Sequence, residues 1–170
     1  MSEQTPKFSW GHININVSNL DRSIEFYRKL GFDVFIPAIP YLGMTADADH
    51  ATLSSESATA LALPNDASGR ACIMQLGDGF PKLDLTEFAG TDQTAPLTNG
   101  DLGLVRICLA TEDLATDVER LSAEGVEFLS DPQTGHAGLA DLAICKDPDG
   151  TLIELIQVYP ERWQALLSGA

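Results

Sequence analysis

Two stretches of this chain repeat one pattern of apolar and polar positions. Residues 11–31 read GHININVSNLDRSIEFYRKLG, and residues 105–125 read VRICLATEDLATDVERLSAEG. An offset of 94 residues places Ile13 on Ile107 and aligns the apolar positions that follow. In each copy the apolar residues first alternate with polar ones and then recur every three or four positions, which predicts a half-buried strand followed by an amphipathic helix.

The first copy shows how this unit is built. Its strand is predicted within residues 8–17, where alternation puts His12 and Asn14 on the polar face. We expect Asp21 to cap the helix that follows. Gly31 is expected to end that helix, because glycine enters the left-handed backbone conformation at little cost.

The remaining elements follow from the same patterns. The stretch 37–69 is too long for a tight turn, so we expect it to hold a short helix or a mobile loop over a cleft. Apolar runs bounded by turn residues predict strands, and a last amphipathic run predicts a helical tail. The predicted strands are 33–36, 70–76, 82–88, 126–129, 139–146 and 151–158, and the predicted tail is 160–167.

These elements predict an α+β fold class with two tandem βαβββ modules. We place module 1 at residues 8–90, the linker at 91–102, module 2 at 103–158 and the helical tail at 159–170, within one structural domain. Each module has one helix and one sheet face to cover. We therefore expect the modules to form an open, curved, barrel-like sheet with the helices on its outer faces.

Charge and cysteine content limit the partners and the location. Ten lysines and arginines face 25 aspartates and glutamates, which gives a net charge of −15. Such a surface repels phosphate backbones and anionic lipids, so we predict a small-molecule substrate and no nucleic-acid or membrane partner. The three cysteines lack a CxxC spacing, which indicates reduced thiols in a cytoplasmic protein. We expect Cys108 and Cys145 in the core and Tyr41 as a packing residue.

Two segments resemble a known family. GHININVSNLDRSIEFYRKLGF, starting at Gly11, and DPDGTLIEL, starting at Asp147, are similar to the vicinal-oxygen-chelate family. This family includes glyoxalase I, methylmalonyl-CoA epimerase, the extradiol dioxygenases and the fosfomycin- and bleomycin-resistance proteins. The resemblance covers about residues 8–158 and implies the two-module fold. Because one fold hosts many chemistries, it implies a range of functions.

The resemblance also implies a metal site. In the family, four inward-facing positions build it, one on the first and one on the last strand of each module. Carried over by position, three of them are possible ligands of a divalent Fe, Mn, Ni, Zn or Mg ion, namely His12, Asp84 and Glu154. Glu87 is the alternative to Asp84, although its opposite parity on the strand ranks it second. The fourth position is Arg106.

Arg106 is the departure from the family pattern, because it occupies the repeat position of His12. A guanidinium is always charged and cannot bind a metal ion. Three arrangements remain open. Arg106 leans away or is neutralised while the metal binds; it replaces the metal by bridging Glu154 or Asp84; or it grips a substrate carboxylate while a three-ligand metal acts.

These residues lead to two functional hypotheses. The first is a divalent-metal enzyme, of the lyase, isomerase or dioxygenase type, that acts on a small carbonyl or diol substrate and forms a homodimer. Glu154 would move a proton, with Asp84 as its partner, and Arg106, Asn14 and His136 would bind substrate. The dioxygenase reaction requires two histidines, which counts against it. The alternative is a metal-free small-molecule binding or drug-resistance protein.

Overall fold

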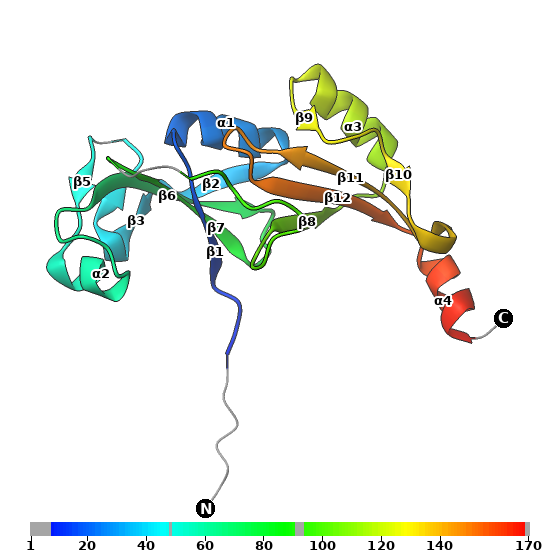
Figure 1. The fold of residues 1–170 in the computed structure, drawn as a ribbon, viewed down its shortest axis with the longest axis horizontal. Coiled ribbons are helices and arrows are strands. Elements are labelled where there is room, and N and C mark those ends of the chain that lie inside the picture. Colours follow the sequence, from blue (N-terminus) through cyan, green and yellow to red (C-terminus); the bar gives the residue numbers. More distant parts are fainter. Residues whose placement is uncertain (1–7, 48, 91–93, 169–170) are drawn as a thin grey trace, which may run out of the picture. The chain divides into compact units, whose positions relative to one another are not determined.

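The computed structural model describes residues 8–47, 49–90 and 94–168. The chain divides into two compact units, Met1–Asp92 and Gln93–Ala170. Each unit contains one five-stranded sheet and repeats the order of strand, helix and further strands (Figure 1). The predicted α+β class is therefore confirmed, and within the described ranges neither sheet closes into a barrel. None of the helices in those ranges is long and apolar enough to span a membrane.

The sheet of the first unit has the order β1-β7-β6-β2, with β5 paired to β6. Strand β1 runs parallel to β7, whereas the other pairs are antiparallel. The elements are β1 (His12–Asn16), α1 (Leu20–Lys29), β2 (Phe32–Ile36), β5 (Ala51–Thr52), β6 (Ser68–Leu76) and β7 (Lys82–Phe88). Helix α1 lies along one face of this sheet (Figure 1).

The repeat pattern correctly locates α1 but not its cap. The helix begins earlier than expected, and its N-cap is Asn19, whose side chain accepts a hydrogen bond from the backbone N–H of Arg22 at 2.9 Å. The prediction that Asp21 caps it is wrong, because Leu20 is fully buried and draws the start of the helix onto the sheet. Asp21 instead pairs with Arg70 at 2.9 Å. At the other end Gly31 has φ +93°, as predicted.

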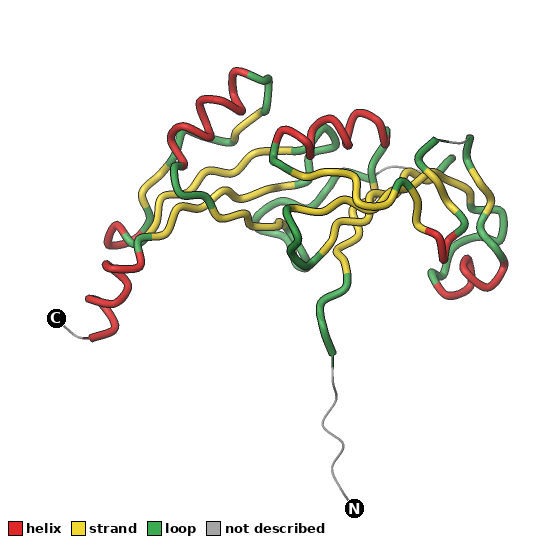
Figure 2. Tube along the Cα trace, turned by 180° about the vertical axis from the view of Figure 1, so that it is seen from behind, coloured by secondary structure: helices red, strands yellow, loops and turns green. Residues whose placement is uncertain are grey.

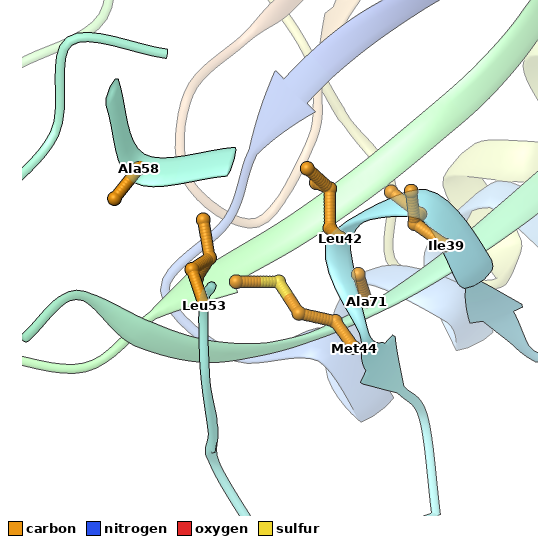
Figure 3. Close-up of a cluster of buried hydrophobic side chains, with 6 residues drawn as sticks. All are labelled: Ile39, Leu42, Met44, Leu53, Ala58 and Ala71. Atoms are coloured by element: carbon orange, nitrogen blue, oxygen red, sulfur yellow. The ribbon is translucent and has the colours of Figure 1, made fainter. Parts of the chain in front are cut away.

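The stretch 37–69 forms a small apolar cluster of its own. It contains β3 (Ala38–Ile39), the 3₁₀ turn η1 (Pro40–Leu42), β4 (Met44–Thr45) and the short helix α2 (Ser55–Ala60), the last of which the sequence anticipated. Figure 3 shows the buried side chains that hold this insertion against β6. They are Ile39, Leu42, Met44, Leu53, Ala58 and Ala71. The cluster anchors both ends of η1, so the turn presents Tyr41 from a fixed base.

The second unit repeats this plan. Its sheet has the order β10-β11-β12-β8, with β9 paired to β11, and β8 runs parallel to β12 as β1 does to β7. Strand β10 and the turn η2 lie in a segment where the sequence predicted only a loop. Helix α4, the predicted tail, lies beyond the ends of the strands (Figure 2). The elements are β8 (Arg106–Ala110), α3 (Leu114–Ala123), β9 (Glu127–Phe128), β10 (Gln133–Thr134), η2 (His136–Gly138), β11 (Ala140–Lys146), β12 (Leu152–Val158) and α4 (Pro160–Ser168).

The two faces of this second sheet differ in character. Ile153 and Leu155 are buried on the face that α3 covers. By strand alternation, Leu152 and Glu154 lie on the opposite face. Cys108 is exposed, so its predicted place in the core is wrong; the alternation of β8 puts it on the face of Arg106. Cys145 is buried as predicted, and burial raises the pKa of its thiol to about 11.

The insertion cluster makes a measurable contribution to stability. Met44 is fully buried, so Met44→Ala removes its contacts and leaves a cavity. We expect the free energy of unfolding to fall by about 2–5 kcal/mol, as measured by urea denaturation followed by circular dichroism. Leu61→Ala, at a half-exposed position of the same insertion, is the control and should change it by less than about 0.5 kcal/mol. Equal losses in both variants would contradict the assignment of this cluster.

Candidate functional site

The first unit brings His12 and Asp84 together. Strands β1 and β7 pair in parallel with Asn14 opposite Asp84, which places the polar side chains of both strands on one face. The Nδ1 atom of His12 lies 3.6 Å from Oδ2 of Asp84. The His12 side chain is 45% exposed, whereas the Asp84 side chain is 1% exposed. An accessible imidazole therefore covers a buried carboxylate.

The Asp84 carboxylate is incompletely satisfied. Its Oδ1 atom is buried and has no hydrogen-bond partner in the described structure. Burial raises the pKa of this carboxyl, while the nearby His12 and a hydrogen bond from Tyr41 act in the opposite direction. Because buried polar atoms are nearly always paired in folded proteins, an unpaired carboxylate oxygen marks a place that suits an external cation or donor.

Tyr41 contacts both of these residues. Its hydroxyl group donates a hydrogen bond to Oδ2 of Asp84 at 3.1 Å. Its ring stacks on the imidazole of His12, with 6.5 Å between centroids and an interplanar angle of 24°. Burial and the charge of Asp84 raise the pKa of Tyr41 to about 12. The prediction that Tyr41 is a packing residue is wrong, since the residue is 61% exposed and contacts both members of the His12–Asp84 pair.

Glu87, the alternative acid, points to the other face of β7. Its Oε2 atom accepts a hydrogen bond from the backbone N–H of Leu20 at 2.6 Å, at the start of α1. Its Oε1 atom lies 2.8 Å from Nε2 of His50. Glu87 thus joins the helix and the insertion to the sheet, and strand parity separates it from His12.

Asn14 lies on β1, on the same face as His12. Its Oδ1 atom accepts a hydrogen bond from the Thr86 hydroxyl at 3.0 Å, and its amide donates to Asn16 at 2.9 Å. The side chain is exposed and stands in register with Asp84. Asn14 therefore contributes a polar surface next to the His12–Asp84 pair.

The second unit joins Arg106 to Glu154. Arg106 is the first residue of β8, and Glu154 lies on the adjacent strand β12. The Nε group of Arg106 donates to Oε2 of Glu154 at 2.5 Å, and its Nη1 group donates to Oδ1 of Asn99 at 2.9 Å. Of the three arrangements considered for Arg106, this one corresponds to the bridge onto Glu154.

Cys108 borders this ion pair and was not recognised in the sequence as part of it. It stands opposite Glu154 in the β8–β12 ladder. Burial raises the pKa of its thiol, and the charge of Glu154 together with a hydrogen bond to that carboxylate raises it further, whereas Arg106 lowers it. The pKa of the Cys108 thiol therefore depends on the charges of Arg106 and Glu154.

His136 lies away from the Arg106–Glu154 pair. It begins η2, just before β11, and β11 starts opposite the last residue of β12, Val158. Arg106 pairs with Leu152 at the first residue of the same strand. The structure therefore places His136 and Arg106 at opposite ends of the second sheet.

The donor atoms present fit a metal ion in part. The described ranges contain no cluster of three or more His, Cys, Asp or Glu side chains arranged to hold a metal. His12 and Asp84 nevertheless offer one nitrogen and one unpaired oxygen, a donor pair that suits divalent transition ions. In the second unit, Arg106 donates a hydrogen bond to one of the two carboxylate oxygens of Glu154.

Comparison with known proteins agrees with this geometry. A family model described as "Glyoxalase/Bleomycin resistance protein/Dioxygenase superfamily" matches residues 9–155. A lactoylglutathione lyase of Pseudomonas putida is 32% identical over 92% of this chain and 88% of its own length. A lactoylglutathione lyase of Schizosaccharomyces pombe is 27% identical over 92% of this chain, which spans about half of that protein, 49% of its length.

Solved structures show the same fold. A glyoxalase family protein of Bacillus cereus matches with a TM-score of 0.73 at 19% identity, covering 93% of this chain and 98% of that one. Glyoxalase I of Leishmania major matches with a TM-score of 0.59 at 21% identity, covering 95% of both chains. The family match over most of the sequence, together with the fold, shows that the chain belongs to the Glyoxalase/Bleomycin resistance protein/Dioxygenase superfamily.

Proposed function

We propose that this chain is a metal-dependent lyase of the lactoylglutathione lyase type, acting on a small carbonyl substrate. The observation that carries the proposal is the buried Asp84 carboxylate, with one unpaired oxygen and with His12 beside it. The 32% identity to the Pseudomonas putida lactoylglutathione lyase supports the choice of reaction. A ring-cleaving dioxygenase is disfavoured, because only one histidine occupies the positions carried over from the family.

In this proposal His12, Asp84 and Glu154 bind a divalent Fe, Mn, Ni, Zn or Mg ion. The bound ion supplies Lewis acidity at a substrate oxygen. Tyr41 orients Asp84 by its hydrogen bond and His12 by stacking, so both donors keep a fixed direction. Contacts that orient the side chains that bind a metal commonly change its affinity by about 10–100-fold.

Glu154 is the proposed proton carrier. A lactoyl thioester forms from the adduct of a thiol and a 2-oxoaldehyde when one proton moves between neighbouring carbons. The carboxylate of Glu154 takes the proton from the carbon that bears sulfur and returns it to the adjacent carbon. The hydroxyl proton on the first carbon moves to the carbonyl oxygen of the second, so the first oxygen becomes the thioester carbonyl, the second becomes the lactoyl hydroxyl, and atoms and electrons balance without another reactant. Asp84 is its counterpart in module 1. The hydrogen bond from Arg106 fixes the direction of Glu154.

A second candidate has a specific observation in its favour. The 2.5 Å contact between Arg106 and Glu154 matches the arrangement expected if the arginine replaces the metal. The chain would then be a metal-free small-molecule binding or drug-resistance protein. Metal content and turnover separate the two candidates.

Metal binding should depend on His12 and Asp84. Protein purified without a chelating column is expected to hold a divalent ion, and His12→Ala or Asp84→Asn should lower its affinity by roughly tenfold or more. Arg106→His should raise it, because imidazole replaces a charged group that cannot ligate. Elemental analysis and competition titration measure both effects.

The matched control is Glu87→Gln, which removes an acid on the other face of β7 and should keep the metal. Metal-loaded wild-type protein should form lactoylglutathione from methylglyoxal and glutathione. Absence of metal from the purified protein, with no thermal shift on adding any of the five ions, would favour the metal-free candidate instead.

The burial of Asp84 should make stability depend on pH in the chelator-treated protein. Its pKa is raised in the folded state, so the folded protein holds this proton more tightly than the unfolded chain. The contribution of Asp84 to stability is therefore fully present below the unfolded pKa of roughly 3.9 and is lost as the pH rises through the folded value. Asp84→Asn should remove this decline.

Urea unfolding between about pH 4 and pH 7 measures the difference. Relative to wild type, Asp84→Asn should gain stability as the pH increases. Asp141→Asn is a control of opposite sign, because hydrogen bonds hold the pKa of Asp141 low. A difference between wild type and Asp84→Asn that does not vary with pH would contradict the burial of a titrating carboxyl.

Cys108 should report the charge of Glu154. Glu154→Gln removes a negative charge next to the thiol, so its pKa should fall and alkylation by iodoacetamide at about pH 8 should become a few-fold faster. Arg106→Gln removes a positive charge and should slow the reaction. Mass spectrometry of the Cys108 peptide gives the rates, with buried Cys145 as the internal control. Equal rates in the three proteins would be inconsistent with this placement.

A further inference from the structure

A pocket in the second unit is not used by the chemistry described so far. Its volume is about 430 Å³, within the range of small-molecule sites. Its walls are mainly apolar and include Pro96, Leu97, Leu129 and Leu152. Thr98, Asn99, Lys146 and Asp149 supply polar groups, one cation and one acid among them. A cavity of this size and composition fits a short hydrocarbon chain with a polar end.

The walls of the pocket are held in place by local contacts. Pro96 lies so close to Gly150 that a Cβ atom at position 150 would come within 2.9 Å of the proline ring, and Gly150 has φ +96°. Asp101 accepts hydrogen bonds from the backbone N–H of Thr98 at 2.6 Å and from its hydroxyl at 2.8 Å. The segment that forms one wall is therefore fixed against the turn between β11 and β12.

The pocket borders the Arg106–Glu154 pair. Leu152, in its wall, pairs in register with Arg106 and lies two residues before Glu154, hence on the same face of β12. Asn99, another lining residue, accepts a hydrogen bond from Nη1 of Arg106 at 2.9 Å. Arg106 therefore contacts one lining residue, stands in register with another, and is bound to the carboxylate proposed to move the proton.

Arg106 retains donors that are directed away from Glu154. Its Nε group serves Glu154 and its Nη1 group serves Asn99, and no described residue accepts a hydrogen bond from its Nη2 group. The two Nη groups form the outer edge of the guanidinium, which binds a carboxylate through two parallel hydrogen bonds. Lys146, the lysine that lines the pocket, pairs with Glu127 at 2.9 Å. The side chain of Arg106 is 38% exposed, so a ligand can reach its outer edge.

We propose that this pocket binds a carboxylate-bearing apolar substituent of the substrate, with the carboxylate on the outer edge of Arg106. The inference deepens the proposed function and rests on it for the reacting part of the substrate, the adduct of a thiol and a 2-oxoaldehyde. The new part is that this adduct carries a short apolar chain that ends in a carboxylate. Arg106 determines substrate specificity, because the same guanidinium binds the carboxylate of the substrate and orients Glu154. Binding of the substituent itself requires no metal.

The test uses hexanoate and 1-hexanol as probes of the chelator-treated full-length protein, with dissociation constants from NMR chemical-shift titration. Hexanoate is expected to bind at least about tenfold more tightly than hexanol, because hydrogen bonds to a charged group are worth about that factor. Arg106→Gln should raise the dissociation constant of hexanoate by about tenfold and leave that of hexanol unchanged. Leu129→Ser, at a half-exposed position in the pocket wall, should weaken the binding of both probes.

Two further variants complete the design. Arg120→Gln changes an arginine that forms ion pairs along α3 and should leave hexanoate binding unchanged. Arg106→Lys keeps a positive charge next to Glu154 but loses the planar edge of the guanidinium, so it should weaken the binding of hexanoate severalfold. This variant replaces Arg106→Gln if the latter does not fold. Equal affinity for the two probes, or unchanged hexanoate binding in both Arg106 variants, would overturn the assignment.

These outcomes are independent of the test of the lyase. Failure of the protein to bind metal or form lactoylglutathione would remove the proposed reaction and leave the titrations unaffected. Failure of hexanoate to bind would remove the pocket assignment and leave metal content and turnover as they are.

Discussion

The first unit depends on one unfavourable burial, that of the Asp84 carboxylate. An ionised carboxyl group taken out of water costs several kcal/mol unless partners compensate it. Here the compensation comes from His12 at 3.6 Å and from Tyr41 at 3.1 Å, and one oxygen is left unpaired. The parallel pairing of β1 with β7 and the apolar insertion of Figure 3 bring these partners to it. The local structure thus maintains a site whose charge is balanced only in part by the protein.

In the second copy of the repeat, a different partner compensates the charge of the corresponding carboxylate. An acid again stands on the last strand and its partner on the first, but Arg106 replaces the histidine and carries a permanent charge. At 4 Å and an effective dielectric constant of 20, two unit charges interact by about 4 kcal/mol, and a divalent ion roughly doubles that. Glu154 is therefore neutralised from within the protein, whereas Asp84 retains an unpaired oxygen. One duplicated architecture gives one carboxylate open to an external cation and one that is already paired.

Most of the fold could be predicted because its signals are local. Alternation located His12 and Asn14 on the polar face of β1, parity ranked Asp84 above Glu87, and Gly31 ended α1 as expected. The missed contacts join residues distant in sequence or lie outside regular elements. Tyr41 reaches Asp84 across 43 residues from a 3₁₀ turn, and Asn99 reaches Arg106 from an irregular segment. The cap at Asn19 depended on how deeply Leu20 is buried, which no sequence pattern measures.

The difference between the two copies also explains why an arginine is compatible with the proposed reaction. A guanidinium has two edges, and the edge that holds Glu154 is not the outer edge proposed to bind the ligand carboxylate. A carboxylate on the outer edge would add a negative charge next to Arg106 and so reduce the field that opposes a divalent cation. In a chain with a net charge of −15, an anionic ligand needs such a cation to overcome the general repulsion of the surface. The arginine that stands where the family has a metal ligand thereby provides the cation that selects an acidic substrate.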